Sequence, residues 1–305
     1  RAWLDRIMAG RVPQMGRVAL SPMLSPKGRL IGDFTISCLG EEEFQLTASY
    51  GSQAFHFRWF HKHKEDGVTI ANISDKRNGF QIAGPNASKV LQACTGADIS
   101  AIRFLDVMKM TVGMTDCIVQ RISYTGDLGF EIYCDPMGQR QLWDTLWTAG
   151  AAHGMVPFGM RAMMSLRLDK FFGSWLSEYS PDYTAAETGL DRFICWSKNT
   201  DFIGRIASQA ERKKGPKRKL VALEVDADEA DVQGYEPIWL DGVVVGFCTS
   251  GGYSHYSSKS VAIGFLPAIH IAEGRTVEIE ILGQMRPARV ITTPLFDPDG
   301  TALRV

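Results

Sequence analysis

Apolar and polar residues alternate with a period of two in the first part of the chain. Residues 17–24 and 30–38 are two such runs, and the Ser-Pro-Lys-Gly segment at 25–28 between them suits a tight turn. We therefore expect a β-hairpin here. Three further short strands are expected over residues 43–48, 68–74 and 79–83.

A second hairpin is indicated between residues 117 and 134. Two alternating runs, 117–123 and 128–134, flank the turn Tyr124-Thr125-Gly126-Asp127. Along the second run Phe130 belongs to an apolar face, so Glu131 and Tyr133 point to the opposite face.

Helical spacing of apolar residues marks the remaining segments of the first two thirds. Trp3, Leu4, Ile7 and Met8 form a stripe near the start of the chain, although the first residue is Arg1. A domain rarely opens inside a helix, so we expect a processed chain or a piece of a longer one. Helices are expected over residues 2–9, 53–64, 139–153, 161–171 and 201–212, with another beginning at Gly84-Pro85.

The pattern changes after the basic segment at residues 212–219, where like charges surround Gly-Pro and predict a linker. Short strands separated by turn residues follow, over 221–225, 243–249, 260–265, 276–281 and 288–292. They indicate a small antiparallel β-barrel. We thus expect an α/β (α+β) chain with a first domain over 1–211, a linker over 212–219 and a barrel over 220–305.

Charge balance and hydropathy indicate which classes of partner, nucleic acid or membrane, are to be expected. The 33 Lys and Arg residues almost balance 34 Asp and Glu residues, so nucleic acid is not an expected partner, and we interpret the basic segment as a solvated linker. No apolar run approaches the roughly 18 residues that a membrane span needs. We expect no membrane partner and a cytoplasmic location, or the mitochondrial matrix in a eukaryote.

Several kinds of site lack their sequence signatures. The six cysteines lie far apart without CxxC or CxxH spacing, which predicts reduced core thiols. His61 and His63 are two residues apart and cannot share a helix face, so no metal site is expected. No GxSxG, Walker or GxGxxG motif occurs, which argues against a nucleophile-elbow hydrolase, a P-loop enzyme and a dinucleotide-binding fold.

Two carboxylates stand in strand patterns where they are unusual. Asp33 lies within the apolar run LIGDFTI, where an unpaired charge is costly, so it either holds a turn or belongs to a site. Glu131 is either a solvated edge residue or a bidentate acceptor for a planar pair of donors, such as the amide-and-amine edge of a pterin. Tyr124 either packs in its turn or lines a pocket.

Six stretches resemble, in order, the aminomethyltransferase (glycine-cleavage T-protein) family, and still more closely the folate domains of dimethylglycine and sarcosine dehydrogenases. They span nearly the whole chain, which makes chance similarity improbable. The stretches are GRVALSPMLSPKGRLIGDFTI, FQIAGPNASKVLQACTGADIS, RISYTGDLGFEIY, SLRLDKFFGSWLSEYSPDYTAAETGLDRF, DFIGR and GYEPIWLDGVVVGFCTSGGYSHYSSKSVAIGFLP.

The resemblance implies a tetrahydrofolate site and roles for particular residues. Asp33 matches the family's catalytic aspartate, which would accept a proton as N5 or N10 of tetrahydrofolate attacks an iminium carbon. Tyr124 would act beside it and help to line the folate pocket. Glu131 would grip the pterin, while Thr47 and Trp175 match further cofactor-binding positions.

Two departures qualify the resemblance. Met163 stands where T-proteins usually carry an arginine that helps to bind folate or a lipoyl arm, which disfavours lipoyl-carrier chemistry and favours the dehydrogenase type. Family members also carry a few tens of residues before the segment that matches Arg1, so we expect the first subdomain to be truncated here.

The resulting expectation is one-carbon transfer from a small methylamine, or its iminium, to tetrahydrofolate, giving 5,10-methylene-tetrahydrofolate. The implied partners are the amine donor and a flavin oxidoreductase domain or subunit. One alternative is a folate-dependent demethylase that acts on a sulfonium, methoxy or amine-oxide donor. The other is a non-catalytic folate-binding or assembly subunit.

Overall fold

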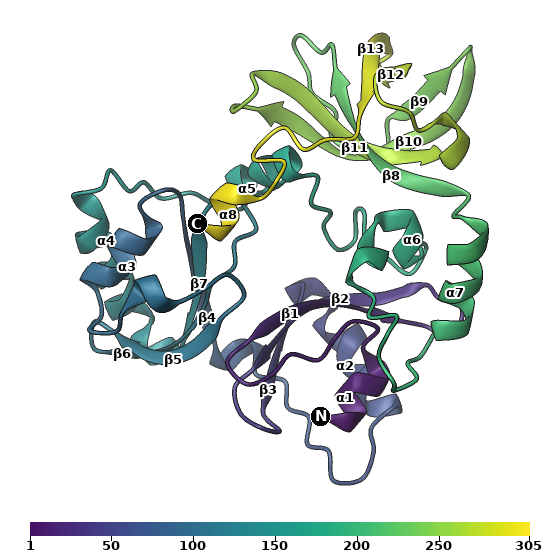
Figure 1. Ribbon diagram of the computed structural model, residues 1–305. Helices are drawn as coiled ribbons and strands as arrows, with labels where there is room; N and C mark the ends of the chain where they lie inside the picture. Colours follow the sequence, from purple (N-terminus) through teal and green to yellow (C-terminus); the bar gives the residue numbers. More distant parts are fainter.

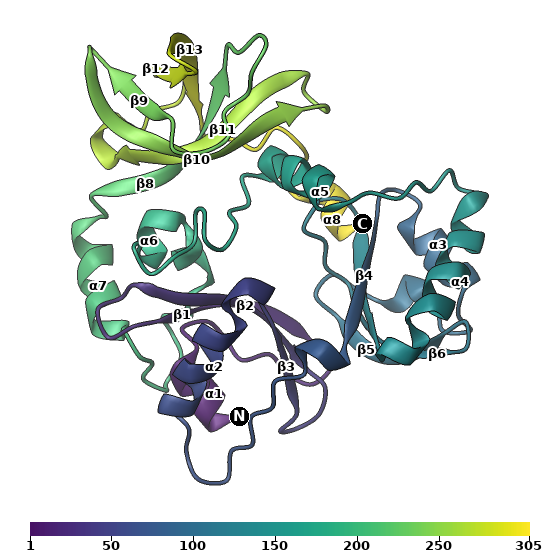
Figure 2. The ribbon, with the colours of Figure 1, turned by 180° about the vertical axis from the view of Figure 1, so that it is seen from behind.

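The computed structural model describes all 305 residues, arranged as two small sheets and a barrel with helices between them (Figures 1 and 2). The first sheet is antiparallel in the order β1 (Val18–Leu24), β2 (Leu30–Cys38) and β3 (Phe44–Thr47). The expected hairpin is confirmed, and Gly28 supplies the positive φ of its turn.

One face of the first sheet is apolar and covered by helices α1 (Ala2–Ile7) and α2 (Gln53–Lys62). Leu4, Phe34, Ile36 and Phe60 belong to the buried cluster between them. Because successive strand residues point to opposite faces, burying this face leaves the polar residues of β2 on the other.

The strand expected over residues 68–74 is wrong. This segment is an extended connection that ends in a 3-10 turn, Ser74–Lys76, and pairs with no strand. Ile70 packs alone against the α1 and α2 cluster. Isolated apolar residues that anchor a connection to the core in this way produce a strand-like sequence pattern although no strand forms.

The second sheet has the order β4-β7-β6-β5, built from β4 (Asn78–Ala83), β5 (Val107–Val112), β6 (Thr115–Gln120) and β7 (Gly129–Cys134). The hairpin expected around the Tyr124 turn is confirmed by the antiparallel pairing of β6 and β7. Helices α3 (Ala87–Ala93) and α4 (Gln139–Ala151) pack on the face that carries Phe130.

The expected C-terminal barrel is confirmed as a closed antiparallel barrel in the order β10-β11-β8-β13-β12-β9. Its side chains, Leu223, Ile238 and Ile279 among them, fill a core of their own. The strands are β8 (Arg218–Val225), β9 (Pro237–Leu240), β10 (Val243–Ser254), β11 (Lys259–Pro267), β12 (Thr276–Ile281) and β13 (Gln284–Ile291).

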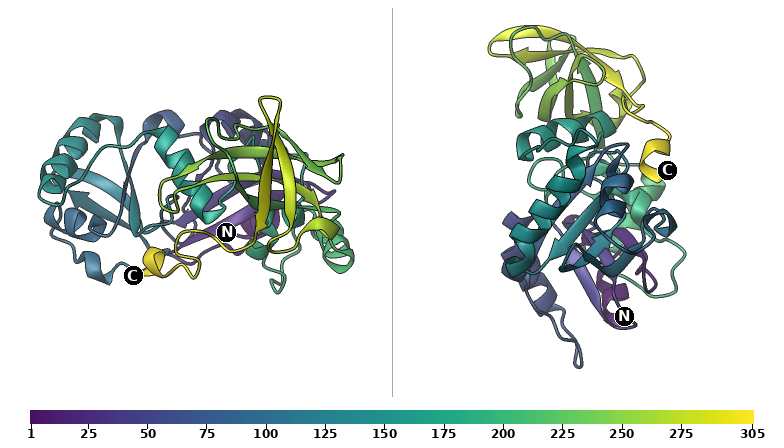
Figure 3. Two further views of the ribbon diagram at one scale, coloured as in Figure 1. Left: turned by 90° about the horizontal axis from the view of Figure 1, so that it is seen from above. Right: turned by 90° about the vertical axis from the view of Figure 1, so that its left-hand side faces the viewer.

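Helical segments join the sheets to the barrel: α5 (Met160–Leu166), the 3-10 turn Arg167–Lys170, α6 (Ala185–Thr188) and α7 (Arg205–Lys214). The basic segment holds the end of α7, residues 215–217 and the start of β8. After the barrel the chain returns to the centre and ends in α8 (Thr301–Arg304), beside α5 and the second sheet (Figures 1 and 3).

All six cysteines are free thiols, and Cys195 is the one that is not fully buried. No helix is both long and apolar enough to cross a membrane.

Candidate functional site

The unburied face of the first sheet carries a short polar row. Asp33 and Thr35 are two residues apart on β2 and therefore share a face, and Thr35 lies opposite Thr47 of β3. All three are half-buried. The hairpin pairing thus brings Asp33 and Thr47 to one surface.

The second sheet has a matching polar face. Gln81 of β4 and Gln120 of β6 both lie directly opposite Glu131 of β7, and Tyr133 follows two residues later on the same side. The other face, with Phe130 and Ile132, is packed under helices. Three neighbouring strands therefore present Gln81, Glu131 and Gln120 in a row.

The two polar faces meet. Thr47 lies close enough to the Tyr133 hydroxyl to perturb its proton affinity, and backbone hydrogen bonds from Val18 to Leu105 and from Val107 to Gly16 tie the sheets at one edge. A cavity of about 540 Å³ adjoins this meeting point, with Gln45 and Tyr133 in its lining, but Asp33, Thr47 and Glu131 are not among the residues that line it.

Asp33 sits in this setting without a side-chain partner that donates to its carboxylate. Burial raises the pKa of Asp33 to about 6, because removing water disfavours the charged form. Tyr124 and Tyr179 are both close enough to Asp33 for its charge to raise their pKa values. A carboxylate with a pKa near neutrality is suited to accept a proton from a reacting group.

Tyr124 is held by the chain that follows α5. Its hydroxyl donates a 2.6 Å hydrogen bond to the carbonyl oxygen of Gly173, and its ring stacks on Phe172 with centroids 6.1 Å apart. Burial raises the pKa of Tyr124 to about 12. At neutral pH this side chain is a neutral hydrogen-bonding group next to Asp33.

Glu131 differs from Asp33 in having a partner. The Tyr133 hydroxyl donates a 2.7 Å hydrogen bond to Glu131 Oε2, and burial raises the pKa of the carboxyl group. Beside it Gln120 is fully buried, yet neither its amide nitrogen nor its amide oxygen has a hydrogen-bond partner. Orphaned polar atoms are costly, and these two belong to the residue paired directly across from Glu131.

Trp175 is placed differently from the other candidates. It is buried and packs edge-on against His56, with ring centroids 5.1 Å apart. His56 Nε2 lies where a side chain on Gly32 would be, and Gly32 and Asp33 point to opposite faces of β2. The contacts of Trp175 are therefore those of a core residue, and its role in folate binding stays a prediction.

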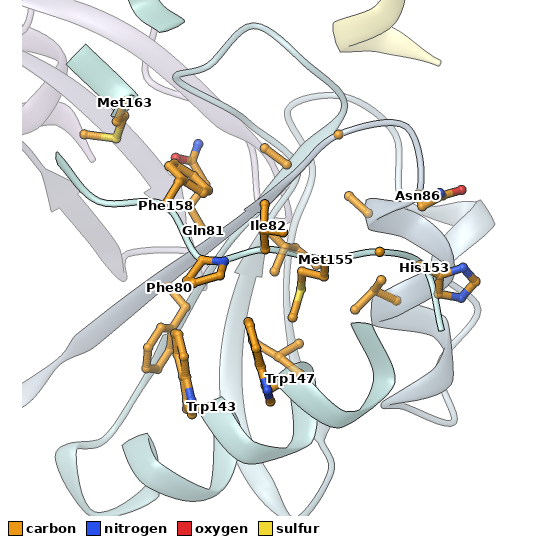
Figure 4. A pocket seen from close by; sticks show the side chains of 18 of the residues that line it. Phe80, Gln81, Ile82, Asn86, Trp143, Trp147, His153, Met155, Phe158 and Met163 are labelled. Carbon is orange, nitrogen blue, oxygen red and sulfur yellow. The ribbon is translucent and has the colours of Figure 1, made fainter. Parts of the chain in front are cut away.

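A further pocket of about 510 Å³ lies along the free edge of β4 (Figure 4). Its walls are mostly apolar, with Trp143, Trp147 and Phe158 among them, and His153 is its one titratable residue. Met163, at the position where T-proteins usually have arginine, lines this pocket, and so does Gln81, which lies opposite Glu131.

Sequence patterns missed several residues of the site. Tyr133 could have been found from its spacing to Glu131. Gln120 and Gln81 enter only through the pairing of β6 and β4 with β7. Tyr179 becomes relevant because its hydroxyl accepts a hydrogen bond from the backbone N–H of Gly173.

The polar faces and the barrel define a chain of the T-protein type, and comparison with known families agrees. Residues 1–198 match the GCVT N-terminal domain, and residues 218–297 match the glycine cleavage T-protein C-terminal barrel domain. The chain belongs to this family.

The similar proteins are of two kinds. The mitochondrial dimethylglycine dehydrogenase of Homo sapiens is 38% identical over 99% of this chain, which spans only 36% of that protein. An aminomethyltransferase of Geobacillus sp. strain WCH70 is 30% identical over 97% of this chain and 82% of its own length. The aminomethyltransferase T of the Bartonella henselae glycine cleavage system has the same fold, with a TM-score of 0.87, 24% identity and coverage of 97% of this chain and 81% of its own.

Proposed function

We propose that this chain transfers a one-carbon unit from a small methylamine, or from the iminium derived from it, to tetrahydrofolate. The observation that carries the proposal is the pair of facing polar surfaces, each with a half-buried acid whose pKa is raised by desolvation: Asp33 on one sheet and Glu131 on the other. Membership of the aminomethyltransferase family makes tetrahydrofolate the natural ligand of this space.

The residues present fit a pterin. A carboxylate matches a planar pair of N–H donors, and Glu131 offers one next to the orphaned amide of Gln120, which can both donate and accept. Tyr133 brings a further hydroxyl group on the same sheet, and Thr47 brings one from the first sheet. These side chains would hold the pterin, with Glu131 as the main contact.

Bound tetrahydrofolate would supply the nucleophilic nitrogen of the reaction. Asp33 would accept the proton released there and would offset the positive charge of an iminium donor. Tyr124 would exclude water from the carboxylate, since its ring stacks on Phe172 and its hydroxyl is committed to Gly173. The barrel and the helices shield this centre but contribute no residue to the two polar rows.

Similarity to dimethylglycine dehydrogenase supports an amine donor and a flavin oxidoreductase domain or subunit as partner. Met163, in place of the usual arginine, supports an amine-oxidising partner over a lipoyl carrier. A folate-dependent demethylase with a sulfonium, methoxy or amine-oxide donor would use the same surfaces but would form 5-methyl-tetrahydrofolate.

Binding is tested by titration calorimetry with folinic acid, for which we expect micromolar affinity. Absence of heat at about millimolar ligand, with folded protein, would remove the folate assignment and with it the non-catalytic folate-binding alternative.

Chemistry is tested with ¹³C-methyl dimethylglycine or sarcosine, tetrahydrofolate, a flavin-dependent amine dehydrogenase and a formaldehyde trap. We expect labelled 5,10-methylene-tetrahydrofolate that depends on this chain and resists the trap. Labelled 5-methyl-tetrahydrofolate formed directly from a donor would favour the demethylase. Binding without either product would favour a non-catalytic subunit.

A further inference from the structure

Arg167 and Glu178 form a fully buried ion pair at the junction between the barrel and the rest of the chain. Arg167 Nη1 lies 3.0 Å from Glu178 Oε2, and the two side chains are 1% and 0% exposed. A pair so far from water is costly unless additional hydrogen bonds satisfy most of its remaining atoms, and here every charged-group atom except Arg167 Nε has a partner. Those bonds show which parts of the molecule the pair connects.

One set of partners belongs to the barrel. Ser250 of β10 accepts a hydrogen bond from Arg167 Nη2 at 2.8 Å and donates one to Glu178 Oε1 at 2.6 Å. The neighbouring Thr249 hydroxyl donates to the same oxygen at 2.7 Å. The barrel strand β10 is thus bonded to both members of the ion pair.

The other set of partners is backbone on either side of Gly173. The carbonyl oxygen of Phe172 accepts from Arg167 Nη1 at 2.7 Å, and the N–H of Ser174 donates to Glu178 Oε2 at 2.7 Å. The ion pair therefore fixes the peptide groups that flank Gly173.

Gly173 in turn holds two tyrosines. Its carbonyl oxygen accepts from the Tyr124 hydroxyl at 2.6 Å, and its N–H donates to the Tyr179 hydroxyl at 3.1 Å. A side-chain carbon at Gly173 would come within 2.5 Å of the Tyr179 ring, so glycine is needed for this approach. Both tyrosines lie close enough to Asp33 to interact with its charge.

We propose that Arg167 and Glu178 are positioning residues through which the C-terminal barrel sets the surroundings of Asp33. The chain of contacts runs from Ser250 through the ion pair to Gly173 and its two tyrosines. The inference rests on the proposed function for the role of Asp33 as proton acceptor. It gives the barrel a part in the reaction although the barrel supplies no residue to either polar face.

Removing a charge would leave its partner buried and unpaired, so the test uses the barrel end of the network. Ser250→Ala deletes one acceptor and one donor at the ion pair. Ser260→Ala is the matched control, because Ser260 is also a buried barrel serine whose hydroxyl donates to a carboxylate, that of Asp231, at 2.6 Å. Thermal unfolding of both variants measures how much stability each loses relative to wild type.

We expect Ser250→Ala to lower the rate of methylene-tetrahydrofolate formation at least tenfold relative to Ser260→Ala. The dissociation constant of folinic acid should change less than threefold, because Glu131 and Gln120 lie on the other sheet. Equal rates in two variants of equal stability would overturn the proposal.

A second readout does not need turnover. Asp33 is titrated by NMR in protein labelled with ¹³C at the aspartate carboxyl carbon, and Asp33→Asn assigns the signal. We expect the pKa of Asp33 to fall toward its ordinary value in Ser250→Ala, since looser tyrosines admit water, and to stay unchanged in Ser260→Ala. An Asp33 titration that is identical in wild type and Ser250→Ala refutes the positioning role.

The two readouts distinguish failure of the proposed function from failure of the positioning role. A wild-type chain that forms no folate product contradicts the proposed function, while the titration still decides the positioning role. If Ser250→Ala does not fold, Thr249→Val replaces it, since it removes one donor to Glu178 and keeps the side-chain shape. The same rate and titration comparisons with Ser260→Ala then apply.

Discussion

The two sheets have the same architecture, but the acidic residues on their polar faces differ in hydrogen bonding. Each is antiparallel, buries its apolar face under two helices and turns a polar face inward. On the first sheet Asp33 has no side-chain partner, and burial raises its pKa to about 6. On the second sheet Glu131 accepts a hydrogen bond from Tyr133 and stands between two glutamines.

Under the proposed function, this difference assigns proton transfer to Asp33 and ligand recognition to Glu131. A desolvated carboxylate without hydrogen-bond partners has a pKa near neutrality and can act as a base. A carboxylate set among donors and acceptors is part of a patterned surface that recognises a planar ligand. The same strand position can thus serve either purpose, depending on its neighbours.

Asp33→Asn should have the largest effect. It keeps the shape of the side chain but removes the proton acceptor, so one-carbon transfer should fall by about 10²–10⁴-fold. The measurement is labelled methylene- or methyl-tetrahydrofolate formed, because a flavin partner can consume the amine unaided. Folinic acid affinity should change little.

The wild-type rate should also rise with pH through about 6, as Asp33 loses its proton. The residual rate of the Asn variant should lack this rise. A wild-type rate of product formation in the Asn variant would make Asp33 a structural acid.

Glu131→Ala should affect binding instead. Loss of a charge-assisted pair at the pterin edge should weaken folinic acid binding by about 1.5–3 kcal/mol in calorimetry. Glu280→Ala is the control, since Glu280 is another half-buried strand glutamate, located on β12 of the barrel. An unchanged dissociation constant in folded Glu131→Ala would reduce Glu131 to an edge carboxylate.

The same Asp33→Asn variant should be more stable than wild type above neutrality. The folded-state pKa of about 6 exceeds the ordinary 3.8, so the folded chain binds a proton more tightly and loses stability as pH rises from about 4 to 6. Asparagine removes this loss. Urea unfolding should show a gain of about 1–2 kcal/mol at pH 8, below the full shift because the side chain keeps some contact with water, and no gain near pH 4.

Gln120→Leu should have the smallest effect and tests whether the orphaned amide serves a ligand. Leucine of similar size removes two buried atoms that lack partners, so the ligand-free chain should gain about 0.5–1 kcal/mol in urea unfolding. Folinic acid should bind several-fold more weakly. Equal affinity with greater stability would remove Gln120 from the site.

Elements with strong periodicity, and the residues that interrupt it, are predictable from the amino-acid sequence. Both hairpins, the barrel and the unusual acids Asp33 and Glu131 follow from local alternation, because that alternation records which face each strand buries. The weaker strands β5 and β9 were missed, and residues 68–74 were assigned a strand, since a short apolar run forms a strand only when a neighbour offers a free edge.

Which residues come into contact depends on how the sheets and the barrel pack together. Gln120 joins Glu131 through cross-strand pairing, and Thr47 reaches Tyr133 through the approach of two sheets that are far apart in sequence. The link from Arg167 and Glu178 to the barrel depends on hydrogen bonds across 71 to 83 residues of chain. Patterns along a chain encode burial, whereas partners and pKa values depend on contacts that exist only after folding.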